Sequence, residues 1–156
     1  MSDDDRFLRR AVALAARDID AGGGPFGAVI TRGGDIIAEG TNRVTVAHDP
    51  TAHAEIVAIR AACRALDDFS LAGCVIHSSC EPCPMCLGAI YWARLSRVHH
   101  AATRADAAAI GFDDQHIYDE FARPPAARRL PIFHRPLPEA DALFKAWAAK
   151  PDKVPY

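Results

Sequence analysis

The chain has 156 residues, of which 50% are hydrophobic and 24% are charged, and its formal net charge is −2. This composition is typical of a globular domain that can bury a core without disulfide bonds. The slightly negative charge argues against a protein that binds duplex nucleic acid or tRNA. Because no segment approaches the ~20 apolar residues of a membrane span, we expect one domain over residues 1–156 without a nucleic-acid or membrane partner.

The N-terminal residues and the five cysteines together indicate the cellular compartment. Residues 1–10 are acidic and lack the apolar core of a signal peptide, so we expect a cytoplasmic protein. An odd number of cysteines in a reducing compartment disfavours a disulfide framework. Metal binding and buried free thiols are the remaining explanations.

The first part of the chain predicts a helix, a hairpin and a second helix. Residues 2–24 begin with acidic residues and end in glycines, and an apolar helical face is expected from Phe7, Val12, Leu14 and Ile19. Residues 26–44 contain two apolar runs around a Gly-Gly pair, which predicts a hairpin. Residues 49–66 are expected to form a helix with Asp49 as its N-cap and Pro50 as its first residue.

Strands and helices alternate in the second part. The apolar patterns predict a strand over residues 72–79, a helix over 83–95, a strand over 96–103, a helical segment over 105–121 interrupted near Gly111, and a helix over 138–150. This alternation predicts an α/β domain with helices on both faces of one sheet. The hairpin adds an antiparallel pair, so the sheet should be mixed.

Cysteine and histidine side chains converge on a predicted metal site. Cys83 and Cys86 are spaced i, i+3 at a helix start, where the helix dipole lowers thiol pKa values and favours the metal-binding thiolate. His53 supplies a third ligand, and Glu55 follows two residues later. Both lie near a helix start, where side chains lean back toward the N-terminus. The two helix starts should meet at one end of the sheet and share one zinc ion.

The pattern H-x-E followed by P-C-x-x-C matches the signature of zinc-dependent deaminases. Three protein ligands leave the fourth zinc position for water, whose pKa falls to about 7, and Glu55 is placed to transfer protons. A closed structural site with Cys80 as the fourth ligand is the alternative, and Cys-x₂-Cys-x₂-Cys also resembles part of an iron–sulfur motif. Pro82 favours an extended Glu81, which places Cys80 at a strand end, and a structural site leaves Glu55 without a role. We therefore favour the open catalytic site.

Beyond the zinc motif, a resemblance to a known protein family extends over nearly the whole chain. It is carried by "GGPFGAVI", "DPTAHAE", "SCEPCPMCLGAIYWAR", "DAAAIGFDD" and the final Tyr156, which together resemble bacterial guanine deaminases of the cytidine deaminase superfamily. The zinc motif is specific for the superfamily, whereas the GFDD segment and the tail carry the substrate assignment. The resemblance implies a three-layer α/β/α fold with a mixed, roughly five-stranded sheet, and hydrolytic deamination of guanine to xanthine and ammonia.

The resemblance also implies residue roles. His53, Cys83 and Cys86 bind Zn²⁺, and Glu55 and Asp114 transfer protons. The residues implied to contact the purine base are Phe26, Asn42, Ala54, Trp92 and Tyr156. From the residues alone, Asn42 would more often be a turn residue, Phe26 and Trp92 would be packing residues, and Asp114 would be a solvated cap.

The resemblance further implies a homodimer in which the C-terminal segment crosses to the partner and closes its site. As a plain terminus, the tail would instead be disordered. Two functional alternatives remain: another deaminase of the superfamily acting on a nucleoside, cytosine or tRNA adenosine, and a non-enzymatic zinc-binding module. His77, His99 and His100 lie on predicted strands, and we interpret them as structural because three ligands are already available.

Overall fold

The computed structural model describes residues 2–112 and 114–156. The chain divides into two compact units, Met1–Tyr118 and Asp119–Tyr156, which are treated separately below. The strands are β1 (Gly27–Arg32), β2 (Asp35–Thr41), β3 (Val75–Cys80) and β4 (Arg97–Ala102). The α-helices are α1 (Asp3–Asp20), α2 (Val44–Ala47), α3 (Ala54–Leu66), α4 (Pro84–Trp92), α5 (Arg104–Ala109), α6 (Asp114–Ala122) and α7 (Pro138–Ala149).

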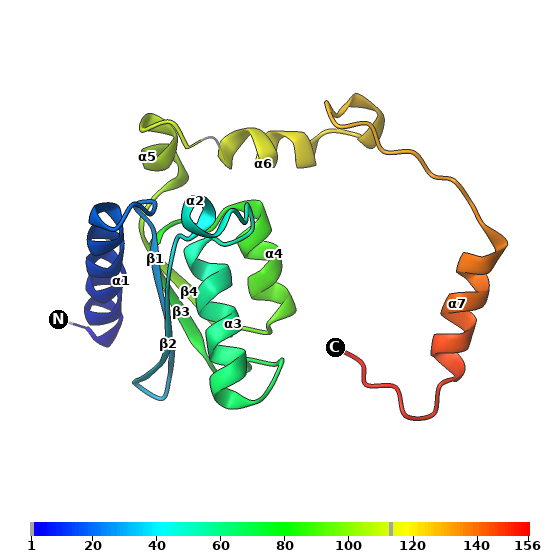
Figure 1. Ribbon diagram of the computed structural model, residues 1–156, viewed down its shortest axis with the longest axis horizontal. Coiled ribbons are helices and arrows are strands. Elements are labelled where there is room, and N and C mark those ends of the chain that lie inside the picture. Colours follow the sequence, from blue (N-terminus) through cyan, green and yellow to red (C-terminus); the bar gives the residue numbers. More distant parts are fainter. Residues whose placement is uncertain (1, 113) are drawn as a thin grey trace. The chain divides into compact units, whose positions relative to one another are not determined.

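The four strands found in the described residues form one mixed sheet in the order β2-β1-β3-β4. β1 pairs antiparallel with β2 and β3, and β3 pairs parallel with β4 through the α4 crossover. Helix α1 covers one face of the sheet, and α3 and α4 cover the other (Figure 1). The predicted α/β fold with a mixed sheet is confirmed, and four strands instead of roughly five is a small difference.

The strand register brings several element ends together at one end of the sheet. Gly27 at the start of β1 pairs with Thr41 at the end of β2, and Ala28 pairs with Ser78 near the end of β3. Cys80, which ends β3, pairs with Ala102, which ends β4. Helices α4 and α5 begin just after these strand ends, so residues distant in the sequence can form one site.

Helix α1 uses a different face from the one expected. Phe7 and Leu14 are buried as predicted, but Val12 is 46% exposed and Ile19 is 54% exposed. The sheet-facing stripe also contains Ala11, which lies four residues after Phe7 and three before Leu14, and Ala15, which lies four residues after Ala11. Val12 and Ile19 lie off this stripe, so that part of the prediction is wrong.

Helix α3 begins at Ala54 instead of Pro50, so Asp49 is not its N-cap. The Asp49 carboxylate accepts hydrogen bonds from the Thr51 backbone N–H at 2.8 Å and the Thr51 hydroxyl at 2.7 Å. This local turn competes with helix formation, as short acidic side chains commonly do. The N-cap is His53, with extended backbone angles, and this position turns its ring toward the helix end.

Gly40 allows α3 to approach the sheet closely. A Cβ atom at this position would lie 2.3 Å from the Ala54 carbonyl oxygen and 2.6 Å from the Ala58 nitrogen. Both contacts are to helix backbone, which cannot move aside cheaply. The close approach fixes the first turn of α3, and with it His53 and Glu55, against the end of the sheet.

The unit Asp119–Tyr156 contains the end of α6, a short 3₁₀ helix (Pro125–Ala127) and α7. The prediction of a helix near residues 138–150 is confirmed. Within this unit, the Arg128 guanidinium donates to the Glu120 and Phe121 carbonyl oxygens. Among the described residues of the whole chain, no helix combines the length and apolar character that crossing a membrane requires.

Candidate metal centre and pocket

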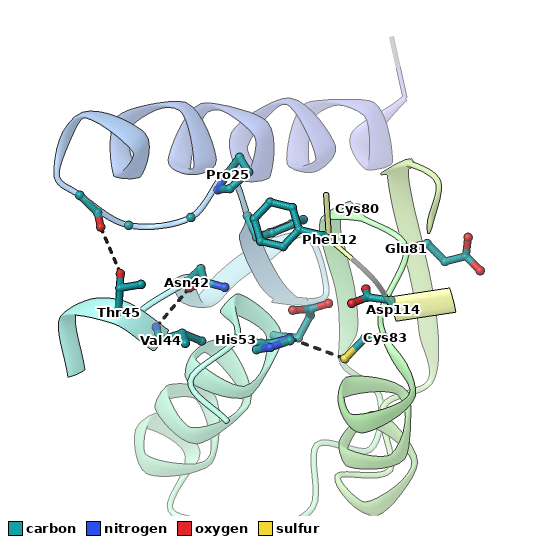
Figure 2. A pocket seen from close by; sticks show the side chains of 15 residues that line it. Pro25, Asn42, Val44, Thr45, His53, Cys80, Glu81, Cys83, Phe112 and Asp114 are labelled. Carbon is teal, nitrogen blue, oxygen red and sulfur yellow. Dashed lines mark hydrogen bonds between the residues drawn. The ribbon is translucent and has the colours of Figure 1, made fainter. Parts of the chain in front are cut away.

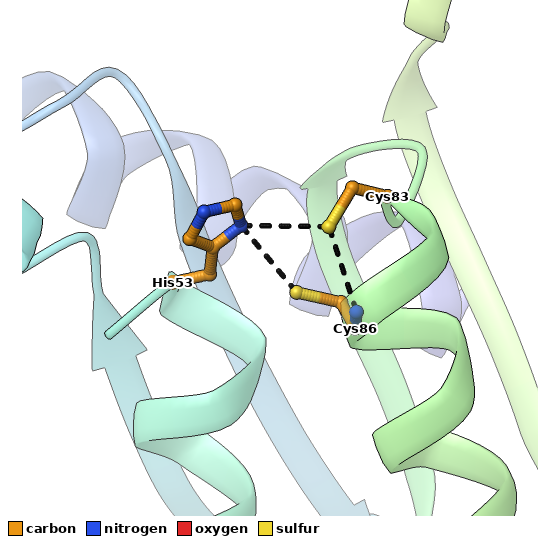
Figure 3. A group of neighbouring side chains, drawn as sticks. All are labelled: His53, Cys83 and Cys86. Atoms are coloured by element: carbon orange, nitrogen blue, oxygen red, sulfur yellow. Dashed lines mark hydrogen bonds between the residues drawn. The ribbon is translucent and has the colours of Figure 1, made fainter. Parts of the chain in front are cut away.

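Three predicted metal ligands meet where α3 and α4 begin. His53 is the N-cap of α3, and Cys83 is the N-cap of α4, with Pro84 in the first turn. The His53 Nδ1 atom lies 3.6 Å from Cys83 Sγ and 3.5 Å from Cys86 Sγ (Figure 3). The sequence predicts that His53, Cys83 and Cys86 lie together, and the structure brings them together.

These separations fit a tetrahedral zinc ion. With Zn–S bonds of about 2.3 Å and Zn–N bonds of about 2.0–2.1 Å, the sulfur and nitrogen ligands of one zinc stand about 3.6 Å apart. In the described part of the chain, this is the one group of three metal-ligating side chains whose ligand atoms all lie within 4.8 Å of one another. The donor set of one imidazole and two thiols is a zinc-type set.

The two thiols differ in their proton affinity. Hydrogen bonding from Cys86, helped by the nearby His53 ring, lowers the pKa of the Cys83 thiol to about 4. The same hydrogen bond to Cys83, together with burial, raises the pKa of Cys86. The Cys86 backbone N–H also donates to Cys83 Sγ at 3.5 Å, as expected at a helix N-terminus. Of the two thiols, Cys83 is therefore the one that loses its proton more readily.

Cys80 lies outside this group. It ends β3, as expected, and its Sγ atom donates to the Thr103 carbonyl oxygen at 3.5 Å. Burial raises the pKa of the Cys80 thiol to about 11, which favours the neutral form. The geometry agrees with the open three-ligand site and not with the closed alternative.

Glu55 occupies the first turn of α3 beside the metal ligands. Its side chain is buried, with 7% of the residue exposed, and burial raises the pKa of the carboxyl to about 6. A carboxyl that titrates near neutral pH can both accept and release a proton, which is the requirement for general acid–base catalysis.

A cavity of about 490 Å³ opens beside these side chains. Figure 2 shows His53 and Cys83 on one side of it and Asn42 on another. The residues that line it are Gly22, Gly23, Gly24, Pro25, Phe26, Asn42, Val44, Thr45, His53, Glu55, Cys80, Glu81, Cys83, Phe112 and Asp114. The predicted proton-transfer pair, Glu55 and Asp114, therefore shares one cavity with two of the three metal ligands.

Asn42 is buried in the cavity wall, with 7% of the residue exposed. Its Oδ1 atom accepts a hydrogen bond from the Val44 backbone N–H at 3.1 Å. This is the turn contact that the sequence alone favours. Because the oxygen is engaged, the amide nitrogen is the group that Asn42 can offer to a ligand as a hydrogen-bond donor.

Two aromatic rings form another part of the wall. Phe26 and Phe112 meet edge to face with ring centroids 4.8 Å apart. Sequence reasoning named Phe26 but missed Phe112, and it also missed Thr45 and Glu81. For Phe112, the available signal was its place directly before the acidic pair in the GFDD segment. Asp113 of that pair lies outside the described residues.

Three predicted substrate contacts do not line the cavity within the described residues. Ala54 is completely buried, and Trp92 ends α4 with 64% of the residue exposed. Tyr156 belongs to the separate C-terminal unit. These roles remain predictions.

Comparison with known proteins identifies the family. Residues 1–102 match the model of the cytidine and deoxycytidylate deaminase zinc-binding region. The chain is 53% identical to the guanine deaminase of Bacillus subtilis (strain 168) over 96% of this chain and 97% of that protein. A crystal structure of a Bacillus subtilis guanine deaminase superposes with a TM-score of 0.94 at 52% identity, covering 97% of this chain and 98% of the other.

Two further proteins are similar to this chain at lower identity. The chain is 34% identical to a tRNA-specific adenosine deaminase of Aquifex aeolicus (strain VF5), over 92% of this chain and 93% of that protein. A structure solved in complex with 2,6-diaminopurine is 37% identical, with a TM-score of 0.69, over 71% of this chain and 62% of the other. The chain therefore belongs to the zinc-binding cytidine and deoxycytidylate deaminase family.

Proposed function

We propose that this protein is a zinc-dependent guanine deaminase, which hydrolyses guanine to xanthine and ammonia. The observation that carries the proposal is the shared cavity, which is lined by a buried carboxyl, metal-ligand side chains, two aromatic rings and an amide. The similarity to the Bacillus subtilis guanine deaminase over nearly the whole chain supports guanine as the substrate.

His53, Cys83 and Cys86 are the residues proposed to hold zinc. Bound zinc supplies a Lewis acid that lowers the pKa of water to about 7. Glu55 accepts the proton of the attacking water and delivers it to the ring nitrogen next to C2. Its raised pKa suits both halves of this transfer.

The remaining walls orient the base. The Phe26 and Phe112 rings can pack against a flat purine, and the Asn42 amide nitrogen can donate to a purine acceptor atom. Asp114, which lines the same cavity, is proposed to help protonate the departing amino group. Ammonia then leaves from C2.

Ammonia release from a panel of substrates tests the proposal. The panel contains guanine, guanosine, adenine, cytosine and a tRNA with adenosine at the wobble position, and bound zinc is measured in the same preparation. We expect rapid release from guanine and at most slow release from the others. Release from another member alone would assign a different deaminase activity, and bound zinc without any release would support a non-enzymatic module.

We further propose a homodimer in which the C-terminal segment closes the partner's pocket. Support comes from the composition of that segment: α7 has no buried residue, and it carries exposed Leu143, Phe144 and Trp147. An apolar helix face of this kind needs a partner surface. The proline-rich stretch over residues 123–131 is suited to a crossing connection.

Mixed dimers test the exchange. Two inactive chains are combined: Glu55→Ala, and a chain truncated before α7. If the lid acts on the partner, the truncated chain's Glu55 and the other chain's tail restore one working site. Absence of recovery in mixed dimers of demonstrated composition would contradict the exchange.

The free state of all five cysteines supports a reducing, cytoplasmic location.

A further inference from the structure

Tyr118 connects α6 to the loop that leads into the metal ligand Cys83. Its hydroxyl donates a hydrogen bond to the Pro82 carbonyl oxygen at 2.9 Å. Pro82 lies between the end of β3 and Cys83, the N-cap of α4. Burial raises the pKa of the Tyr118 phenol, so the hydroxyl remains a donor throughout the neutral range.

Arg104 reinforces this connection from α5. Its guanidinium carbon lies 4.6 Å from the centroid of the Tyr118 ring, within the range of a cation–π interaction. The Arg104 backbone N–H donates to Glu81 Oε2 at 3.1 Å, and its Nε atom is 3.7 Å from Glu81 Oε1. Tyr118 is thus held on its ring face and at its hydroxyl by residues adjoining the same loop.

Asp114 lies one helical turn before Tyr118. Residues four positions apart lie on the same side of a helix, so fixing Tyr118 also fixes the direction of Asp114. Asp114 begins α6 and lines the cavity (Figure 2). Helix α5 ends at Ala109, and the described residues 110–112 that follow it are not helical, so the orientation of the first turn of α6 depends on contacts such as these.

We infer that Tyr118 is a positioning residue that, through Pro82 and Arg104, holds Asp114 in the cavity for proton transfer. The inference rests on the proposed function, because it assigns Tyr118 a part in the same reaction. It differs from a purely structural role in one respect: its effect on turnover must pass through Asp114.

The test is a double-mutant cycle measured as ammonia release from guanine. Tyr118→Phe keeps the ring over Arg104 and removes only the hydroxyl. We expect kcat to fall about 5- to 20-fold, with KM, zinc content and melting temperature close to those of the wild type. In an Asp114→Asn background, the same substitution should change kcat by less than about 2-fold, because the group that it positions is already disabled.

Two further variants sharpen the cycle. Tyr91→Phe is the matched control, since Tyr91 is 72% exposed on α4, and it should leave kcat unchanged. Arg104→Lys keeps the charge but loses the planar stacking group, so it should give a smaller loss of kcat that also disappears in the Asp114→Asn background.

Three results would overturn the inference: an unchanged kcat in Tyr118→Phe, a silent Asp114→Asn, or an equal fold-loss from Tyr118→Phe with and without Asp114. In the last case, Tyr118 would act through the Cys83 loop, and zinc affinity would fall. Failure of the proposed function is separate and is seen in the wild type, which would then release no ammonia from guanine.

Discussion

The two faces of the sheet carry contrasting histidine clusters. On the α3 and α4 side, His53 meets two thiols within 3.6 Å beside a cavity and a buried carboxyl. On the α1 side, His77 stacks on His99 with ring centroids 5.2 Å apart, and Asp4 Oδ1 lies 4.0 Å from His77 Nδ1 and 3.5 Å from His99 Nε2.

The residue types are similar, but the arrangements differ. The side chains of Asp4, His77 and His99 do not place three ligand atoms within 4.8 Å of one another, as the metal group does. His77 is almost completely buried, contacts the Phe7 ring, and shares a hydrogen bond of 3.2 Å with the Thr31 hydroxyl. It does not line the cavity. The contrast teaches that chemistry depends on convergence of ligand atoms at an open space, whereas a buried histidine elsewhere is a packing residue.

Removing the Glu55 proton-transfer group should produce the largest effect. Glu55→Gln keeps the shape of the side chain but cannot accept a proton, so we expect ammonia release to fall by about 10²–10⁴-fold with zinc content unchanged. Glu39→Gln is the control, because Glu39 lies on β2 and pairs with Arg10 of α1, and neither residue lines the cavity. A Glu55→Gln enzyme within a few fold of the wild type would refute the proposed mechanism.

The three-ligand assignment predicts unequal effects for neighbouring cysteines. Cys83→Ser should lose most of its bound zinc, because it removes a thiolate ligand. Cys80→Ser should retain about one zinc per chain, since Cys80 instead contacts the Thr103 carbonyl. Metal analysis of the purified variants distinguishes the two, and equal losses would indicate a closed structural site.

The position of the reactive cluster depends on the close approach of α3. Gly40→Ala would place a methyl group against the α3 backbone, so we expect destabilisation of about 1–3 kcal/mol and a melting temperature lowered by roughly 3–10 °C. Gly88→Ala in α4 meets nothing within 4 Å and should be neutral or stabilising. Equal melting temperatures for the two variants would show that the approach is unimportant.

The α1-side cluster should affect stability and not chemistry. Burial, followed by the nearby His99, lowers the pKa of His77 in the folded state, whereas Asp4 opposes the shift. The unfolded chain therefore binds a proton more readily, and stability is lost as the pH falls below the unfolded value of about 6.5. Between pH 7.5 and 5.5, this loss is at most about 1.4 kcal/mol.

Denaturant unfolding of His77→Gln at both pH values checks this effect. The variant should lose less stability on acidification than the wild type and should keep its turnover at neutral pH. His134→Gln, at an exposed position, should follow the wild type. A His77→Gln variant with the wild-type pH dependence would show that this ring does not titrate as described.

Much of the fold and of the metal group could be predicted from the sequence because the signals are local. The Gly33-Gly34 hairpin, Pro84 at a helix start and the Cys83–Cys86 spacing each act over a few residues. The predicted start of α3 was wrong because the Asp49 carboxylate accepts hydrogen bonds from the Thr51 backbone N–H and hydroxyl in a local turn and does not cap the helix.

Features that depend on tertiary contacts could not be predicted from the sequence. The missed Phe112 and the Tyr118–Pro82 hydrogen bond depend on how the chain returns across the cavity after α5. The register of strands far apart in the sequence brings these residues together. The spacing of residues in the sequence does not predict such contacts. The metal group could be predicted because its ligands lie within short motifs at the starts of two helices.

Zinc K-edge X-ray absorption of the zinc-loaded protein tests the central claim, an open three-ligand centre, most directly. We predict a first shell of about two sulfur atoms, one imidazole nitrogen and one lighter oxygen or nitrogen ligand, and the same shell in Cys80→Ser. A third sulfur in the wild type that is lost in Cys80→Ser would contradict the account, because it would close the site against water.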